Sequence, residues 1–212
     1  KFKVINNGIN FLKLQEYKSR SYLEYRNKFK NKDVFLHIGS FRHQKNHEFM
    51  LKVFSSLEPI KNNLFLILIG DGEGKKILLD MVDKLNIRKN VIFTGIQKDL
   101  GKYFDVSHIF FFPSIQEGFV NVIIEAQYMK LPICGSNIPA LDESIYKEYH
   151  QYRFDPNNIE EASSCLMKIL KDYKSKKLEH SRINAADFVK DNFKIELMAK
   201  QIADLYYELK NN

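Results

Sequence analysis

The stretch NLFLILIG, residues 63–70, is the clearest indication of the fold. It places a continuous apolar run between an asparagine and a glycine, without the alternation that a strand with one solvated face would show. A strand that is apolar on both faces is typical of a parallel sheet with helices on both sides. The stretch therefore predicts a buried strand in an α/β protein.

Other apolar runs lie on both sides of this strand, and segments with helical periodicity separate them. The strands that we expect cover residues 33–39, 63–70, 90–95, 108–113 and 131–135, with a short sixth strand at 152–154. The helices that we expect cover about residues 17–29, 46–57, 74–85, 99–104 and 120–129, and the chain after residue 158 is expected to be helical only. This alternation predicts an α/β fold with a Rossmann-like, doubly wound parallel sheet of about six strands and extra C-terminal helices.

The same pattern divides the chain into three parts. Residues 1–32 are predicted to be a linker and a charged helix from a missing N-terminal domain, because the sequence begins without Met. Residues 33–157 are the predicted Rossmann-like domain, and residues 158–212 are predicted as helices that pack on it or cross back from it. Ligands of doubly wound sheets bind beyond the carboxyl ends of the strands, so the loops that follow the strands are the candidate sites.

The charge of the chain favours anionic partners without naming one. Lys and Arg number 33 against 26 Asp and Glu, which gives a formal net charge of +7. No arginine-rich tract or nucleic-acid motif is present, and we expect no nucleic-acid partner. Basic residues crowd residues 13–32 and 171–177. They suggest peripheral contact with an anionic membrane, although solvated helix faces explain them at least as well.

Further features of the sequence bear on the location of the protein and on metal binding. No apolar run approaches the ~18 residues of a membrane span, and the first residues do not resemble a secretory signal. We expect a cytoplasmic protein, with a peripheral position on the inner face of the plasma membrane as a further hypothesis. The histidines and cysteines show no metal-ligand spacing, so we expect no metal. His43 and His47 are four residues apart but are expected to face solvent at a helix start.

The loop after the first predicted strand, GSFRHQKN at residues 39–46, carries two cations at the start of a helix. Arg42 and Lys45, together with free backbone N–H groups, would suit a diphosphate. Both could equally be solvated loop residues. The next loop, GDGEG at residues 70–74, has Lys75 where a dinucleotide-binding fingerprint needs glycine. Its glycines are explained by a tight turn.

The most informative stretch is PSIQEGFVNVIIEA, residues 113–126. Gly118 would let a ligand approach the backbone closely, next to the free N–H groups of a helix start. Glu117 precedes this helix and Glu125 lies within it, slightly over two turns later. The two carboxylates could therefore accept hydrogen bonds from the hydroxyls of one sugar or ribose. Alternatively, Glu117 is an ordinary helix-start acid and Glu125 is exposed or paired.

Taken together, short motifs in a fixed order resemble a known family. They are NG (7–8), G and QKN (39 and 44–46), IGDGE (69–73), VIFTG (91–95), FPS (112–114), EGFVN (117–121), EA (125–126) and LPI (131–133). The series resembles the C-terminal, donor-binding domain of retaining glycosyltransferases of family four, the glycosyl transferases group 1, of the capsule, exopolysaccharide or lipopolysaccharide type. The resemblance covers about residues 4–140 and implies the C-terminal half of a GT-B fold.

The resemblance also implies roles for individual residues. Glu117, Lys45 and Arg42 would be catalytic, with Glu117 at the donor sugar and Lys45 at the departing diphosphate. Glu125 would bind the ribose. The other donor-binding residues implied are Gly118, Phe119, Val120, Asn121, Gly39, Ser40, Ile96 and Gln97, the last two at the base. The chain departs from the family at Ser40, Val120 and Lys130, where Arg, Pro and Gly are usual; Ser40 puts diphosphate binding in doubt.

The resemblance implies transfer of a sugar, with retention, from a nucleoside-diphosphate sugar, most simply a UDP-sugar, to a carbohydrate or lipid-linked acceptor. It implies no metal and no further cofactor. Because the acceptor-binding domain is missing, we expect the chain alone to bind nucleotide weakly and to transfer no sugar. A UDP-sugar 2-epimerase of GT-B architecture and a non-catalytic nucleotide-binding module remain as alternatives.

Overall fold

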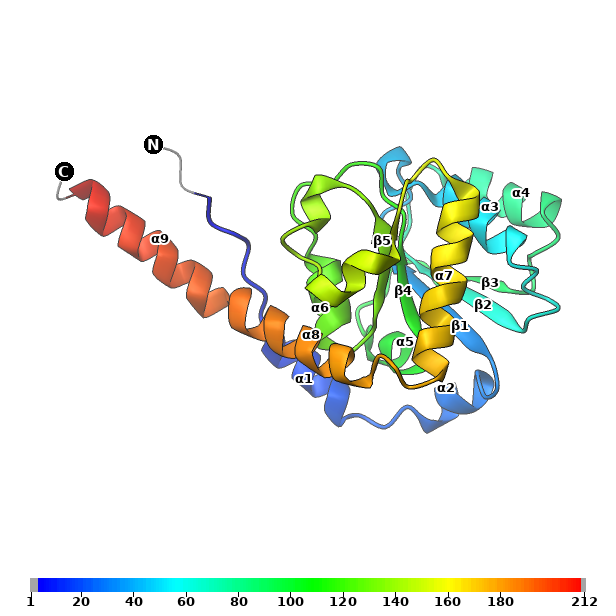
Figure 1. Ribbon diagram of the computed structural model, residues 1–212, viewed down its shortest axis with the longest axis horizontal. Helices are drawn as coiled ribbons and strands as arrows, with labels where there is room; N and C mark the ends of the chain where they lie inside the picture. The colour runs from blue at the N-terminus through cyan, green and yellow to red at the C-terminus, as the bar shows by residue number, and fades with distance from the viewer. Residues whose placement is uncertain (1–3, 211–212) are drawn as a thin grey trace.

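The computed structural model describes residues 4–210, apart from the side chain of Ser19. Within this part of the chain, six parallel strands form one sheet in the order β3-β2-β1-β4-β5-β6 (Figure 1). The strands are β1 (Asp33–Ile38), β2 (Leu64–Ile69), β3 (Val91–Phe93), β4 (Ile109–Phe112), β5 (Ile133–Ser136) and β6 (Arg153–Phe154). This strand order is that of a Rossmann-type doubly wound sheet. The predicted fold class is confirmed.

Helices cover both faces of the sheet. They are α1 (Phe11–Ser19), α2 (Leu23–Lys28), α3 (His47–Ser56), α4 (Lys75–Lys84), α5 (Gly101–Val106), α6 (Asn121–Tyr128), α7 (Ile159–Lys174), α8 (Glu179–Asn192) and α9 (Ile195–Lys210), with short 3-10 turns η1 (His43–Lys45), η2 (Pro139–Leu141) and η3 (Lys147–Tyr152). Helix α3 packs between α4 and α7, whereas α5 contacts α1 and α2, and α6 contacts α8. The central strands are therefore buried on both faces, as their continuous apolar sequences predict.

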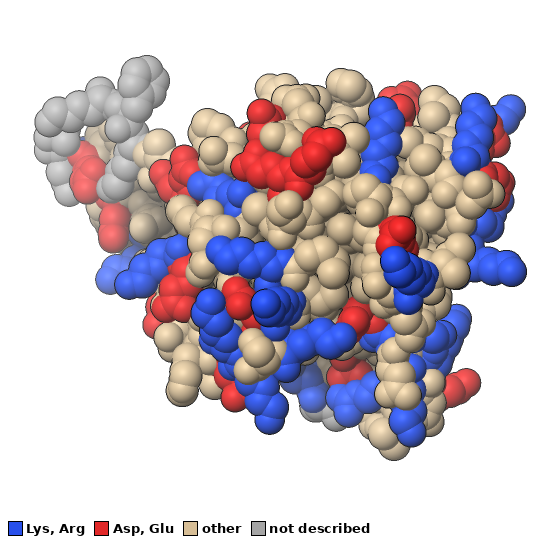
Figure 2. All heavy atoms as spheres, turned by 45° about the vertical axis from the view of Figure 1, so that its right-hand side comes forward, with Lys and Arg blue, Asp and Glu red and all other residues tan. Residues whose placement is uncertain are grey.

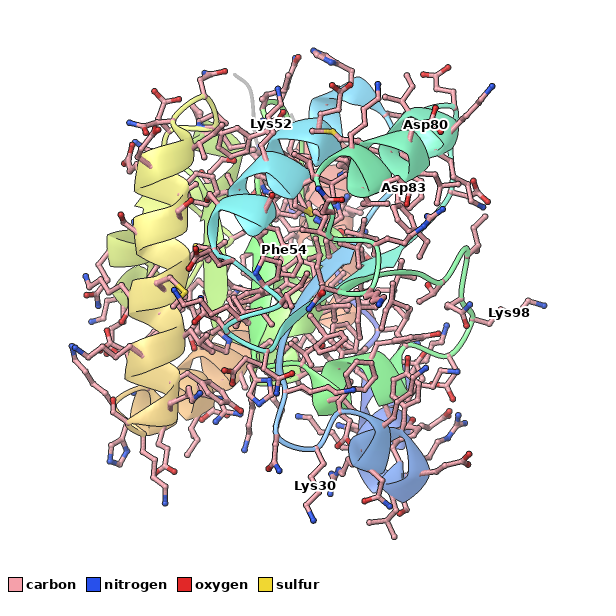
Figure 3. All side chains as sticks on the ribbon, turned by 90° about the vertical axis from the view of Figure 1, so that its right-hand side faces the viewer. Lys30, Lys52, Phe54, Asp80, Asp83 and Lys98 are labelled. Atoms are coloured by element: carbon pink, nitrogen blue, oxygen red, sulfur yellow. The ribbon has the colours of Figure 1, made fainter. Side chains whose placement is uncertain are left out.

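Helix α3 illustrates why the covering helices form where they do. Its apolar residues recur at helical spacing and are buried, and Phe54 is fully buried beneath the helix. Figure 3 shows Phe54 among the interior side chains, while Lys52 of the same helix, and Asp80 and Asp83 of α4, lie on the outside. This division of faces stabilises the helix on the sheet by burial of its apolar side.

One predicted helix is wrong. The expected single helix over residues 17–29 is two helices, α1 and α2, because the backbone at Arg20 is extended, with φ −84° and ψ 146°. On one straight helix, Tyr17 and Phe29 would point about 120° apart; the break lets both side chains reach the core. Arg20 Nη1 contacts Asp99 Oδ2 at 2.7 Å, and Arg26 Nε contacts Asp105 Oδ2 at 2.6 Å. Residues 11–29 are thus docked against α5 and the loop before it.

The two ends of the described chain cross each other on one side of the sheet. Ile9 N donates to Phe193 O at 2.7 Å, and Ile195 N donates to Ile9 O at 3.2 Å. A Cβ atom on Gly8 would lie 2.4 Å from Ile195 Cα, so only glycine fits at this crossing. From here both ends extend away from the sheet on the same side, and none of the residues of α9 is buried (Figure 1).

The C-terminal part is helical, as predicted, with α7, α8 and α9 joined by short connections. The division at residues 32 and 157 stays a prediction, and its outermost residues, 1–3 and 211–212, lie outside the described residues. Among residues 4–210, no helix has both the length and the apolar composition required to cross a bilayer.

Candidate functional site

The strand order reverses between β1 and β4, and the candidate site lies where these two strands end. They pair only at Phe35↔Ile109 and Leu36↔Phe110, two residues before either strand ends. Beyond this point β1 leads to the loop that contains Lys45, and β4 leads to the loop that contains Glu117. A crevice at such a reversal is the usual ligand position in doubly wound sheets.

The structure brings Lys45 and Glu117 together across this crevice. Ile115 N donates to Gln44 O at 2.9 Å, which ties the two loops to each other. Lys45 Nζ lies 2.6 Å from Glu117 Oε1, and the two side chains are only 19% and 13% exposed. A pair that is this shielded from water interacts more strongly than an exposed surface pair. Two of the three predicted catalytic residues, Lys45 and Glu117, are therefore in contact in the crevice.

Next to this pair, the backbone offers a row of free N–H groups. Within residues 4–210, the amides of residues 118–122 donate to no acceptor of the chain, and no side chain caps the start of α6. Val120 is 3% exposed, so its side chain is not available to a ligand. The ring of Phe119 packs 5.6 Å from that of Phe193, centroid to centroid. The helix start can therefore receive an anion.

Glu117, Gly118 and Phe119 line a cavity of about 460 Å³. Its other walls come from residues 4–7 and from the segment after β5, and its polar lining residues are Asn6, Asn7, Glu117, Glu143 and Ser144. Amide, carboxylate and hydroxyl groups suit a ligand rich in hydroxyls. The sequence interpretation did not assign Asn6 or Glu143 to the site. The NG motif at residues 7–8 pointed to this wall.

Arg42 does not join Lys45. It is exposed and lines a second groove, of about 480 Å³, between α3, α4 and the start of α7, together with Glu73 and Ile77. Ser40 is also exposed, and its carbonyl oxygen accepts from Arg42 N at 2.8 Å. The groove and the crevice are lined by different residues. The predicted role of Arg42 beside Lys45 therefore gains no support from its position.

Glu125 lies further along α6 and does not line the cavity of Glu117. It is half-buried; burial raises the pKa of its carboxyl group, and the positive charge of Lys13 on α1 partly opposes this rise. Within the described part of the chain, its carboxylate has no hydrogen-bond partner. A half-buried carboxylate without such a partner is costly, which distinguishes Glu125 from an ordinary surface acid.

The remaining predicted donor-binding residues lie at neighbouring strand ends. Gly39 N donates to Ile69 O at 2.9 Å, and Gly70 N donates to Gly95 O at 3.0 Å, so the ends of β1, β2 and β3 are tied together. Ile96 is 80% exposed after β3, and Gln97 Nε2 donates to Thr94 O at 2.7 Å. Asn121, at the start of α6, is exposed.

The expectation for His47 is wrong. His43 faces solvent, but His47 is 4% exposed. The reason is Asn46, whose left-handed backbone (φ 55°) turns the chain so that α3 begins at His47 with this side chain inward. The imidazole packs edge-on against the rings of His37 and Phe41, each at 4.8 Å between centroids.

Burial of His47 predicts that stability depends on pH. Its pKa is lowered from 6.5 to about 4, first by burial and then by the positive charge of Lys45. Between these values the unfolded chain binds a proton that the folded chain does not. The free energy of unfolding should therefore fall by about 3 kcal/mol from this residue as the pH decreases from about 6.5 to about 4.

Denaturant unfolding of the chain at about pH 7 and about pH 5 measures this slope. His47→Phe should make the slope smaller, whereas His43→Phe, at an exposed position, should keep the wild-type slope. Equal slopes in the wild type and the His47 variant would contradict the prediction.

Comparisons with known proteins identify the family of the chain. The model of the family described as glycosyl transferases group 1 matches residues 20–187. The chain belongs to this family. It is 36% identical over 138 residues to an uncharacterized glycosyltransferase of Methanocaldococcus jannaschii, covering 65% of this chain and 34% of that protein.

Two further proteins are similar to most of the chain. One is the Escherichia coli UDP-Gal:alpha-D-GlcNAc-diphosphoundecaprenol alpha-1,3-galactosyltransferase, 26% identical over 185 residues, with 85% of this chain and 46% of that protein covered. The other is Anabaena HepE, solved in complex with UDP-glucose, with a TM-score of 0.82, 20% identity, and 97% of this chain and 57% of that chain covered. The chain thus spans between a third and a half of the two sequence relatives. Family membership favours a glycosyltransferase over the 2-epimerase alternative.

Among residues 4–210, no group of three or more His, Cys, Asp or Glu side chains is arranged to hold a metal ion. The positive charge in the crevice comes from Lys45, and the free N–H groups add partial positive charge beside it.

Proposed function

We propose that this chain is the donor-binding part of a retaining glycosyltransferase. The enzyme would transfer a sugar from a nucleoside-diphosphate sugar to a carbohydrate or lipid-linked acceptor in cell-surface polysaccharide synthesis. The observation that carries the proposal is the shielded Lys45–Glu117 pair beside the free amides of residues 118–122. This arrangement joins a cation, anion-binding N–H groups and a carboxylate at the end of a parallel sheet.

Each group has a role in the proposed reaction. Lys45 and the amides would stabilise the negative charge that develops on the departing nucleoside diphosphate. Glu117 is bound by Lys45 through one oxygen and retains acceptor capacity for a hydroxyl of the donor sugar. Glu125 would accept hydrogen bonds from the ribose, and the loop at Ile96 and Gln97 would meet the base. Arg42 would act only if the loop of residues 39–46 changed its conformation on donor binding.

We propose a UDP-sugar as the donor, without a metal ion or further cofactor. Support comes from two similar proteins: HepE was solved with UDP-glucose, and the E. coli relative is named as a UDP-Gal-dependent galactosyltransferase. Lys45 supplies in the crevice the kind of charge that a bound cation supplies in other phosphate sites.

A thermal-shift panel of UDP-, GDP- and ADP-sugars tests the proposal on the chain itself, because binding to the folded state raises the melting temperature. We expect a rise with the UDP-sugars, unchanged by EDTA, and no sugar transfer by the chain alone. If no nucleotide sugar raised the melting temperature, or if Glu117→Ala and Glu125→Ala left the rise unchanged, the donor-site assignment would be wrong. A rise that needed a divalent metal would refute the metal-free mechanism alone.

The acceptor-binding domain is the proposed partner at the ends of the chain. Helix α9 presents apolar side chains that the described residues do not cover, among them Ile202, Tyr206 and Leu209, at 38%, 72% and 67% exposure. Its projection beside the N-terminal segment (Figure 1) fits a helix that crosses back to that domain.

A cytoplasmic location, with peripheral contact between the enzyme and the inner, anionic face of the plasma membrane, is also proposed. Lys and Arg are more frequent in the lower half of the face in Figure 2, where Figure 1 places α2 and the end of α7. The last turns of these helices contain Arg26, Lys28, Lys171 and Lys174. Co-sedimentation with anionic but not neutral vesicles at low salt supports the contact, and equal binding to both refutes it.

A further inference from the structure

Two buried histidines lie beneath Lys45, and the proposed reaction does not use them. His37, in β1, is fully buried, and His47, at the start of α3, is 4% exposed. The Nε2 atom of each ring is buried without a hydrogen-bond partner among the described residues. Buried polar atoms without partners are uncommon, so this pair requires an explanation beyond apolar packing.

His37 occupies the point where β1 and β4 separate. The last paired residues of these strands are Leu36 and Phe110. One residue further on, His37 Nδ1 lies 3.0 Å from Phe111 O. A carbonyl oxygen only accepts, so Nδ1 carries the proton. The side chain of His37 thus bridges the two strands where their backbone pairing has stopped, at the floor of the crevice.

The bridge leaves His37 Nε2 as a lone-pair acceptor directed at the loop above. A Cβ atom on Gly39 would lie 3.0 Å from this nitrogen and 3.4 Å from Cδ and Cε of Lys45. The ring itself is stacked on Phe112 at 5.8 Å and on Phe110 at 6.4 Å, and His47 meets it edge-on at 4.8 Å. The imidazole, Gly39 and the stem of Lys45 therefore form one packed unit.

Both rings are uncharged in this place. Burial lowers the pKa of His37 well below its ordinary value. The neighbouring His47 and Lys45 act in the same direction, and the hydrogen bond to Phe111 O opposes them. Burial and Lys45 act in the same direction on the pKa of His47. A neutral support does not repel the ammonium of Lys45, as a second cation below it would, and adds no negative charge to that of Glu117.

We propose that His37 is a positioning residue: its neutral ring, packed against His47, bridges β1 and β4 where their backbone pairing ends and holds Lys45 in place for the diphosphate. The inference rests on the proposed function. The effect is confined to the phosphate-binding end of the site, because the loop at Ile96 and Gln97, assigned to the base, follows a different strand.

The chain contains a matched control at the other end of the same two strands. His108 precedes β4, and its Nδ1 accepts a hydrogen bond from Val34 N at 3.1 Å. Replacing His108 also removes an imidazole bridge between the β1 and β4 segments, but at the amino end of the strands, whereas Lys45 follows the carboxyl end of β1. His37→Phe and His108→Phe therefore differ mainly in which end of the strand pair they affect.

The test compares UDP and uridine binding by calorimetry for the wild-type chain, His37→Phe and His108→Phe. We expect His37→Phe to weaken UDP binding at least about tenfold, as for one lost charge-assisted contact, with uridine affinity and melting temperature close to those of the wild type. His108→Phe should keep the wild-type ratio of UDP to uridine affinity. Imidazole ¹⁵N NMR of the wild type should show that UDP shifts the Nε2 signal of His37 and not the signals of His108.

The opposite results overturn the proposal. A wild-type affinity ratio in His37→Phe refutes it, as does equal weakening of UDP and uridine with a lower melting temperature, the result expected of a purely structural residue. If His37→Phe does not fold, an unchanged His37 Nε2 signal on addition of UDP refutes it. A wild-type chain that binds no UDP overturns the proposed function as well, whereas wild-type binding with an unaltered His37 variant overturns this inference alone.

Discussion

Replacing Lys45 with alanine is expected to reduce sugar transfer by the complete enzyme about 100- to 1,000-fold. The ammonium of Lys45 contacts Glu117, with Nζ 2.6 Å from Oε1. It lies beside the free amides at the start of α6. Its ammonium would stabilise charge that is larger on the departing diphosphate than on the bound donor, so the loss should fall mainly on kcat. The measurement is kcat and KM with a UDP-sugar donor.

Lys52→Ala is the matched control for this prediction. Lys52 lies on the exposed side of α3, the helix that follows the loop of Lys45, and its removal changes the net charge by the same amount. We expect kcat within about twofold of the wild type for this variant, as for most surface substitutions. Comparable losses in both variants would mean that net charge, rather than the position of Lys45, governs the rate.

Replacing Glu125 with glutamine should weaken binding of UDP about 10- to 100-fold, the range for lost hydrogen bonds to a charged group. The same change should raise the melting temperature of the ligand-free chain, because it removes a half-buried carboxylate that lacks a hydrogen-bond partner among the described residues. A gain in stability with a loss of binding is typical of a residue kept for function.

Calorimetry with UDP and thermal unfolding without ligand measure the two effects of the Glu125 variant. Glu179→Gln, an exposed acid in the first turn of α8, provides a comparison in which neither quantity should change by much. If Glu125→Gln bound UDP as tightly as the wild type, Glu125 would have no part in the donor site, whatever its effect on stability.

The strands and most helices could be predicted because burial dominates their sequences. Continuous apolar runs such as residues 64–69 have few alternatives to a central strand, and four of the five early helices begin and end close to the expected residues. The helix over residues 17–29 could not be predicted as two, because no glycine or proline marks the break at Arg20. That break depends on contacts with α5, far away in the sequence.

The part of the candidate site that could be predicted is the part whose position follows from the ends of the strands. Lys45 and Glu117 follow two strands that are neighbours in the sheet, so their loops meet. The burial of His47 depends on the left-handed turn at Asn46, which is a local backbone choice that residue types leave open. The contribution of Asn6 and Glu143 depends on how distant segments pack over the cavity.

The crossing of residues 8–9 with the start of α9 has a mechanical consequence. Gly8 contacts Ile195, and its amide lies 3.2 Å from the sulfur of Met198. Because these contacts join the two segments at one point, a displacement of the start of α9 would displace residues 8–9 with it.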